Sequence, residues 1–159
     1  MMLRFLFCFL SFMCISLCYT QSKKEVKKFK IKTVNTTETD SLKTINDYNV
    51  VYDNNGEVIQ ETTYNKDGTF KATHKYKYNS KGDEIEEFEY DSTNVLKEKK
   101  TTKYNALGDK SEELFFDKDQ KLFKKNIFAY DGKGLKTIRK TFNGAGKLLI
   151  TKKYTYTFK

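Results

Sequence analysis

Two glutamates and one histidine are the residues of this chain whose types suit acid–base chemistry. Glu84 and Glu86 lie two positions apart in an alternating segment, and His74 is the one histidine. Paired carboxylates hydrolyse glycosides, one acting as general acid and the other as base or nucleophile. Alternation in a β-strand, with lysines facing the glutamates, explains the same residues without a site. We therefore expect no enzymatic activity and keep a glycoside hydrolase as the third alternative.

Four tyrosines that recur every 26 residues could form a binding row: Tyr52, Tyr78, Tyr104 and Tyr130. A periodic aromatic row among polar neighbours can stack on sugar rings or on an extended peptide. The competing interpretation is cross-strand aromatic packing that only stabilises a sheet. The four tyrosines are our candidate binding residues, and structural packing is the stronger interpretation because copied units repeat their structural residues first.

We expect no metal site and no cofactor. The segment Asp53-Asn54-Asn55-Gly56-Glu57 has calcium-binding residue types, but turns need the same residues and the full ligand series is missing. His74 alone cannot hold a metal ion. All three cysteines, Cys8, Cys14 and Cys18, precede Thr20, so a chain cleaved there has no thiol for catalysis or metal binding.

The first twenty residues predict a secretory signal peptide. Arg4 precedes the apolar run Phe5–Leu17, which is too short to span a bilayer comfortably, and cleavage after Thr20 suits a signal peptidase. The segment Ile15-Ser16-Leu17-Cys18 also resembles the lipobox of bacterial lipoproteins, which makes Cys18 a candidate lipidation site. We expect a secreted or periplasmic protein of the cell envelope, with an outer-membrane lipoprotein as the alternative.

All of the candidate binding and acid–base residues lie within a tandem repeat. An aromatic residue recurs in alternate steps of 12 and 14 residues, followed in all but the last case by Asn or Asp and usually by Gly three residues later. The nine positions are Tyr52, Tyr64, Tyr78, Tyr90, Tyr104, Phe116, Tyr130, Phe142 and Tyr156. This pattern predicts hairpins with a type I turn and a left-handed fourth residue, where Asn94 and Gln120 replace Gly.

Strands of eight and ten residues between the turns predict an all-β fold: a curled antiparallel β-meander of nine or ten strands, as an open sheet or partial shell. If Tyr78 faces Glu84, paired numbers have an even sum, so all nine aromatic positions share one face and Lys75 faces Glu87. Alternate turns then carry an apolar row that curling, a lid or a partner must cover. Its members are Tyr64, Phe70, Tyr90, Leu96, Phe116, Leu122, Phe142 and Leu148.

The predicted organisation has three segments: a signal peptide over 1–20, an N-terminal segment over 21–42 with a candidate edge strand at Phe29–Thr33, and a repeat domain over 43–159. The formal net charge is +9, which suits acidic glycans, anionic lipids or nucleic acid. Because acidic and basic strands alternate, we expect much of this charge to be neutralised within the sheet. We do not expect nucleic acid as a partner, and we expect membrane contact only if Cys18 is lipidated.

The motif Tyr-Asx-x-x-Gly followed by a strand resembles the YD repeat of the Rhs family. It is complete at Tyr52-Asp53…Gly56, Tyr64-Asn65…Gly68, Tyr78-Asn79…Gly82, Tyr104-Asn105…Gly108 and Tyr130-Asp131…Gly134. The resemblance implies tandem hairpins that coil into a β shell. The self-cleaving core of that family is rich in Pro, and this chain has no Pro. We therefore expect a short secreted form that keeps the repeat geometry without a toxin cargo or a processing core.

These observations predict a non-enzymatic extracytoplasmic β-repeat protein, a structural or interaction module at the cell envelope that binds a cell-surface glycan or protein. The alternative is a small β-barrel carrier of a hydrophobic ligand, because meandering strands behind a signal peptide also describe a barrel of lipocalin size. The polar middle of the predicted face, with Glu86, Glu98 and Lys124, argues against a dry cavity.

Overall fold

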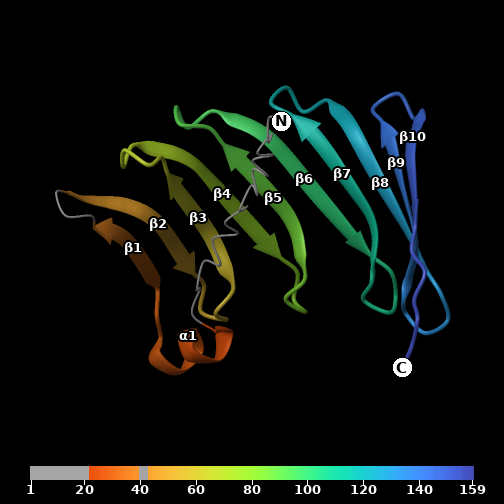
Figure 1. Cartoon of the computed structure of the whole chain (residues 1–159), viewed down its shortest axis with the longest axis horizontal. Coiled ribbons are helices and arrows are strands. Elements are labelled where there is room, and N and C mark those ends of the chain that lie inside the picture. The colour runs from red at the N-terminus through yellow and green to blue at the C-terminus, as the bar shows by residue number, and fades with distance from the viewer. Residues whose placement is uncertain (1–21, 40–42) are drawn as a thin grey trace, which may run out of the picture.

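The chain folds into one antiparallel sheet of ten strands, preceded by a short helix (Figure 1). The computed structural model describes residues 22–39 and 43–159. After α1 (Lys23–Phe29) come β1 (Thr33–Thr39), β2 (Thr44–Tyr52), β3 (Val58–Tyr64), β4 (Phe70–Tyr78), β5 (Glu84–Tyr90), β6 (Leu96–Tyr104), β7 (Lys110–Asp117), β8 (Leu122–Tyr130), β9 (Lys136–Asn143) and β10 (Leu148–Lys153). Each strand pairs with the next, so β1 and β10 form two separate edges. The predicted all-β meander is confirmed, and the sheet is open rather than closed into a barrel.

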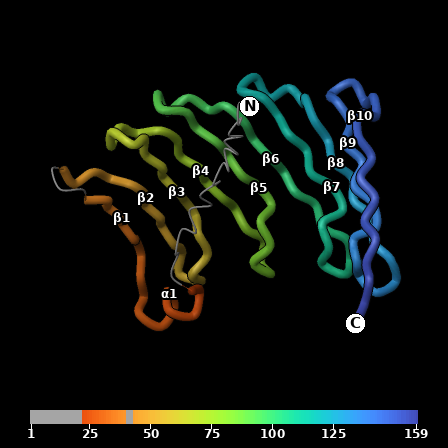
Figure 2. The backbone as a smooth tube through the Cα atoms, viewed as in Figure 1, coloured from red at the N-terminus to blue at the C-terminus, as the bar shows by residue number. Residues whose placement is uncertain are grey.

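The strands form a single twisted layer. Figures 1 and 2 show them fanning from β1 at one side to β10 at the other, with α1 at the end of β1 and β2 rather than over the middle of a face. Among the described residues, no helix is long and apolar enough to cross a membrane. The predicted signal peptide and Cys18 lie outside the described residues.

All eight predicted turns form with the expected geometry. In each, the Asx N–H donates to the carbonyl four residues later and the fourth residue donates back, as in Asn79 N–H to Asp83 O (2.9 Å) and Gly82 N–H to Asn79 O (3.0 Å). The fourth residue has a positive φ throughout, including Asn94 and Gln120, both at 61°. The prediction of type I turns with a left-handed fourth residue is confirmed.

The predicted register is wrong by one residue beyond each turn. Tyr78 pairs with Glu84 as predicted, but Lys77 then pairs with Glu86, which leaves Ile85 without a pairing partner. The same bulge follows the other turns, at the second residue of each outgoing strand. The eight bulge residues are Ile59, Lys71, Ile85, Lys97, Ser111, Phe123, Thr137 and Leu149.

These bulges reverse the parity of the pairing from each strand to the next. One extra residue makes paired numbers add to an odd sum, so even residues of one strand share a face with odd residues of the next. Lys75 therefore pairs with Phe88, and the predicted pairing of Lys75 with Glu87 is wrong. Bulges also bend a strand and increase its twist, which accounts for the curl of the sheet.

The recurring aromatic residues consequently divide between the two faces, and the prediction that they share one face is wrong. One face, here named the tyrosine face, carries Tyr52, Tyr78, Tyr104 and Tyr130. The opposite face carries Tyr64, Tyr90, Phe116 and Phe142. We name it the lysine face because the register also places there Lys75, Lys77, Lys99, Lys103 and Lys125.

The predicted apolar row exists as separate pairs on the lysine face. Tyr90 pairs with Leu96, and the other three aromatic–apolar turn pairs form in the same way. Successive pairs are offset along the strands. On β6, Leu96 pairs with Tyr90 of β5, but the aromatic residue of the next pair, Phe116 of β7, lies opposite Lys99, three residues farther along. The pairs therefore alternate with polar residues instead of forming one continuous apolar strip.

The helix corrects the expectation of an extended strand from Phe29 to Thr33. Ser22 caps α1: its hydroxyl accepts from the Glu25 N–H, and the Glu25 carboxylate accepts from the Ser22 N–H (3.1 Å). This reciprocal pair is a capping box. Lys30 ends the helix in a left-handed conformation, with φ of 52°. The N-terminal segment does contain an edge strand, but that strand begins at Thr33.

The helix completes a small hydrophobic cluster at one end of the sheet. Val26 and Val50 are each 1% exposed and Tyr52 is 4% exposed, so these three form its centre. Farther along the sheet, the buried side chains are mostly polar, as where Thr141 donates to Asn126 (2.8 Å), with Phe115 as a buried aromatic residue. Cross-strand pairs therefore contribute most of what stabilises the later strands.

Candidate binding face

The candidate tyrosines are built into the backbone of the sheet. From Tyr78 on, each hydroxyl donates to the main-chain carbonyl twenty residues earlier. The bonds run from Tyr78 to Val58 (2.7 Å), from Tyr104 to Glu84 (2.8 Å) and from Tyr130 to Lys110 (2.9 Å). Each acceptor directly precedes a bulge, where the regular ladder is interrupted and a carbonyl needs another donor. The tyrosines thus clamp successive hairpins together.

The surroundings of these tyrosines keep their hydroxyls protonated. Burial, reinforced by nearby carboxylates, raises the pKa of Tyr78, Tyr104 and Tyr130 above the usual value. Tyr52 differs from the other three because it lies inside the hydrophobic cluster with Val26. All four candidates therefore occupy positions that stabilise the sheet, and ligand binding through their rings stays a prediction.

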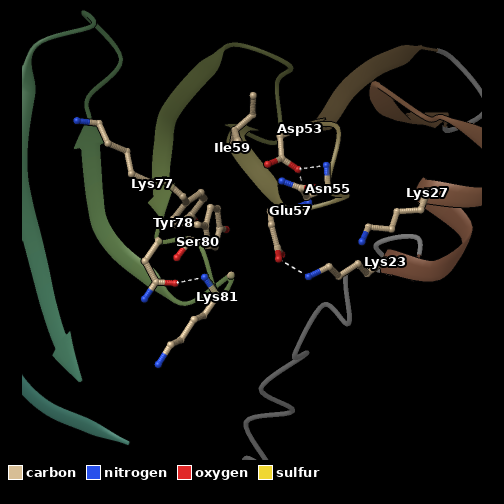
Figure 3. A pocket seen from close by; sticks show the side chains of 13 residues that line it. Lys23, Lys27, Asp53, Asn55, Glu57, Ile59, Lys77, Tyr78, Ser80 and Lys81 are labelled. Carbon is tan, nitrogen blue, oxygen red and sulfur yellow. Dashed lines mark hydrogen bonds and ion pairs between the residues drawn. The ribbon is translucent and has the colours of Figure 1, made fainter. Parts of the chain in front are cut away.

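A polar hollow of about 530 Å³ lies beside Tyr78, between α1 and the turns that follow β2 and β4 (Figure 3). Its carboxylates are already engaged. Asp53 accepts the N–H groups of Asn55 and Glu57, each at 2.8 Å, and Glu57 forms an ion pair with Lys23. Asp53 thus holds its own turn, as turn chemistry requires. Within the described residues, no group of three His, Cys, Asp or Glu could hold a metal ion.

The two candidate acid–base glutamates lie on opposite faces of the sheet. Glu84 is on the tyrosine face, 3.0 Å from Lys100, whereas Glu86 is on the lysine face. The even-sum pairing predicted from the sequence would place Glu84, Glu86 and His74 on one face; the bulge at Ile85 separates the two glutamates, so that placement is wrong. Glycoside hydrolysis needs two carboxyl groups flanking the same bond, which this arrangement does not provide.

An ion cluster crosses the tyrosine face at β4–β6. His74 Nδ1 lies 3.3 Å from Glu87 Oε1, and Lys100 bonds both Glu87 and Glu84. The hydrogen bond with Glu87 raises the pKa of His74, and the bonds from His74 and Lys100 lower the pKa of Glu87 to about 2. All four groups are engaged with one another, so the cluster links β4, β5 and β6 across this face.

On the lysine face, one carboxylate joins two lysines, and this arrangement repeats after 26 residues. The two triads are Lys77–Glu86–Lys99, with N–O distances of 2.8 and 2.7 Å, and Lys103–Glu112–Lys125, with 2.8 and 3.1 Å. The lysine hydrogen bonds lower the pKa of Glu86 and of Glu112. Each triad spans three strands and keeps one uncompensated positive charge.

Aromatic rings stand between the lysines of this face. Lys75 Nζ lies 4.9 Å from the ring centroid of Tyr90, while Lys77 and Lys99 lie 5.2 and 5.3 Å from that of Phe88. The register across β4–β7 gives the alternating row Lys75–Phe88–Lys99–Phe116. Because neighbouring strands are about 4.8 Å apart, the row presents a cation about every 10 Å.

The two faces also differ in net charge. Among the paired residues of β4–β9, the lysine face has a surplus of four positive charges, six lysines against two glutamates. These are Lys75, Lys77, Lys99, Lys103, Lys125 and Lys140, with Glu86 and Glu112. The tyrosine face has five basic residues against six acidic ones: Lys100, Lys110, Lys124, Lys136 and Arg139, with Glu84, Glu87, Glu89, Glu98, Glu113 and Asp117.

Sequence reasoning missed the lysine face as a candidate. The signal was the 26-residue repeat of lysines, since Lys103 follows Lys77 and Lys125 follows Lys99 at that interval. The assumed even register separated these lysines from Phe88 and Phe116, which the bulges bring beside them.

No protein-family model matches the chain, and no curated protein matches it. Among solved structures, it is similar to a crystal structure of TarM, with 16% identity and a TM-score of 0.32 over 79% of this chain and 22% of that chain. A point mutant of S. aureus TarM in complex with fondaparinux, α-GlcNAc-glycerol and UDP gives 15% identity, a TM-score of 0.32 and the same coverage. The complex TcdB2-TccC3-Cdc42 gives 9% identity and a TM-score of 0.23 over 79% of this chain and 10% of that chain. The chain spans about a fifth and a tenth of these structures, and such low scores carry no argument about function.

Proposed function

We propose that the chain is a non-enzymatic interaction module of the cell envelope that binds an acidic, extended glycan across the lysine face. The observation that carries this proposal is the alternating row Lys75–Phe88–Lys99–Phe116, set within a surplus of four positive charges. Ammonium groups attract the carboxylates or sulfates of such a polymer. Aromatic rings offer it large apolar surfaces at fixed positions.

The repeat suits a polymer better than a single small ligand. A chain that crosses the strands meets the triad centred on Glu86 and then the equivalent triad centred on Glu112. Each lysine contributes weakly, since exposed ion pairs stabilise by about 0.2–1 kcal/mol. Repetition on one rigid sheet lets these contacts act together, as linked binding sites do.

The expected localisation rests on the signal-peptide prediction for residues 1–20 and on the resemblance of the Tyr-Asx-x-x-Gly motif to the YD repeat. Mass spectrometry of the chain purified from its native host tests the predicted localisation. Free secretion predicts an N-terminus at Gln21, and lipidation predicts a lipid-modified Cys18 in the membrane fraction. Intact Met1 in the cytoplasmic fraction would contradict both.

The binding test removes three lysines without leaving either bridging glutamate unpaired. In the variant Lys75→Gln, Lys77→Gln, Lys103→Gln, Glu86 keeps Lys99 and Glu112 keeps Lys125. Three lost contacts of about 0.5 kcal/mol each should weaken binding to immobilised heparin about tenfold. Binding is measured by surface plasmon resonance at two salt concentrations, with neutral dextran as a second polymer.

A matched control removes the same charge from other surfaces, through Lys24→Gln, Lys66→Gln and Lys147→Gln, all of which are exposed residues outside the lysine face. We expect this control to retain most of its heparin affinity. Equal losses of heparin affinity in the two variants would show a nonspecific charge effect and would contradict the proposal. Equal binding of dextran and heparin would do the same.

The two alternatives lack structural support. A carrier of a hydrophobic ligand needs an enclosed apolar space, whereas this sheet has β1 and β10 at separate edges. A hydrolase needs its acid and base together, whereas Glu84 and Glu86 lie on opposite faces. The interaction module is therefore the function that the geometry supports best.

A further inference from the structure

The two edges of the sheet have different chemistry. The edge strand β10 carries Leu148, Leu149 and Ile150, which are 47%, 54% and 48% exposed, followed by Thr151, Lys152 and Lys153. The opposite edge strand, β1, is built from Thr, Asn and Val with Glu38 as its charged residue. An exposed apolar edge strand presents unpaired N–H and C=O groups and is a template for another strand.

The β10 edge has the geometry of a strand from inside the sheet. Tyr156, beyond β10, donates to the Lys136 carbonyl (2.7 Å), which repeats the tyrosine clamp of the preceding hairpins. The Tyr154 N–H donates to the Thr137 carbonyl (2.9 Å), so pairing with β9 continues past Lys153. A strand added at this edge would therefore meet the same surface that β5, β7 and β9 meet on β4, β6 and β8.

Strand lengths identify which strand would fit. The strands β2, β4, β6 and β8 have nine residues each, and β3, β5, β7 and β9 have seven or eight. The edge strand β10 occupies a long-strand position, and β1 has seven residues, the length of a short strand. Pairing β10 with β1 of a second copy continues both the alternation of lengths and the alternation of direction. The bulge of the β1–β2 pair falls on β2, at Asp47, so β1 itself contains no inserted residue.

We propose that copies of this chain associate head to tail, with β10 of one pairing antiparallel to β1 of the next in one continuous sheet. The register follows from β2 and β3, where the fifth residue, Tyr48, pairs with the sixth, Thr63. The corresponding positions of β10 and β1 are Lys152 and Glu38. In this register Thr151–Lys153 face Thr37–Thr39 and the pairing continues past Lys153, while Leu148–Ile150 lie beyond the end of β1. A lysine of one edge thus meets the single glutamate of the other. Because the two surfaces differ, each added copy brings a new free edge, and the assembly grows until its ends meet in a ring or as an open chain.

Charge reversal at the predicted pair tests the inference by sedimentation velocity of the full chain, at concentrations up to about 1 mM. The unmodified chain should form a concentration-dependent ladder of species. Lys152→Glu alone and Glu38→Lys alone should each remain monomeric, because like charges then face each other at every contact. An equimolar mixture of the two variants should recover the ladder, since every contact again joins opposite charges.

The control is Lys24→Glu, which changes the net charge equally on α1 and should leave the ladder intact. Circular dichroism confirms that each variant keeps its strand content, and Lys152→Gln with Glu38→Gln offers a milder pair that should weaken association at least threefold. A monomeric unmodified chain would overturn the inference. So would a mixture that fails to recover, or a Glu38→Lys chain that associates unaided, which would indicate pairing of β10 with β10.

Discussion

The tyrosine face and the lysine face use the same recurring aromatic positions for different purposes. On the tyrosine face, Tyr104 donates its hydroxyl to the Glu84 carbonyl (2.8 Å) and joins one hairpin to the next. On the lysine face, Tyr90 presents its ring to Lys75 at 4.9 Å. A single inserted residue after each turn sends alternate aromatic positions to opposite sides of the sheet. One repeated motif thus supplies both the hydrogen bonds that join successive hairpins and the outer surface of a one-layer fold.

Replacing whole rings should have the largest effect and should distinguish the two faces most clearly. We expect Tyr78→Ala with Tyr104→Ala to lower the free energy of unfolding by about 4 kcal/mol, because each half-buried ring and its clamp are lost. Tyr90→Ala with Phe116→Ala should lower the free energy of unfolding by about 2 kcal/mol. The same variant should lose more binding free energy toward heparin than the tyrosine-face variant does. Urea denaturation followed by circular dichroism measures both changes in stability. If the tyrosine-face double variant folds normally but loses its ligand, the tyrosine row is the binding site and our assignment is reversed.

The sequence predicts the hairpins well because turn chemistry is local. Asx at the first position and a left-handed fourth residue specify each turn, and even Gln120 adopts the positive φ that its position requires. The predicted register is wrong because the pairing depends on the bulge after each turn, at residues such as Ile85, and no turn residue indicates that bulge. Ile85 is an ordinary strand residue by type, so nothing in the residue itself marks it as the one that is left unpaired.

The assignment of side chains to faces is wrong for the same reason, which is why the lysine face was not among the predicted sites. A shift of one residue moves a side chain to the opposite face of the sheet. Glu86 and Phe88 therefore lie on the lysine face, whereas the predicted register placed them on the face that carries His74. The helix was predictable: Ser22 and Glu25 have the spacing of a capping box, a local signal comparable to the turns. Long-range pairing, by contrast, is set by the summed contacts of neighbouring strands, which a single strand does not reveal.

Removing only the tyrosine hydroxyl should have a smaller effect, which again differs between the two faces. We expect Tyr104→Phe to lower the free energy of unfolding by about 1 kcal/mol, since the Glu84 carbonyl loses its donor. Tyr90→Phe is the matched variant on the lysine face and should change stability by less than about 0.3 kcal/mol, because the ring that contacts Lys75 remains. Thermal and urea unfolding of the two variants give the difference. Equal effects would show that the clamp contributes nothing specific to the tyrosine face.

The smallest expected effect is a pH dependence confined to the tyrosine face. The pKa of His74 is raised above 6.5 by its bond to Glu87, so its stabilisation is complete below pH 6.5 and is lost as pH rises through the folded-state pKa. The pKa of Glu87 is lowered from 4.5 to about 2, so its contribution is complete above pH 4.5 and is lost as pH falls toward 2. Both contributions are therefore present together between pH 4.5 and 6.5.

Stability should accordingly fall by less than about 1 kcal/mol between about pH 6 and pH 8.5, since the pair is partly exposed. His74→Gln and Glu87→Gln should each abolish this decrease in urea unfolding measured across the range. Glu86→Gln, on the lysine face, should retain it, because Glu86 is paired with Lys77 and Lys99 and not with His74. A decrease that survives in His74→Gln would place the titrating group elsewhere. A decrease lost in Glu86→Gln would mean that the two faces are coupled through the strand they share.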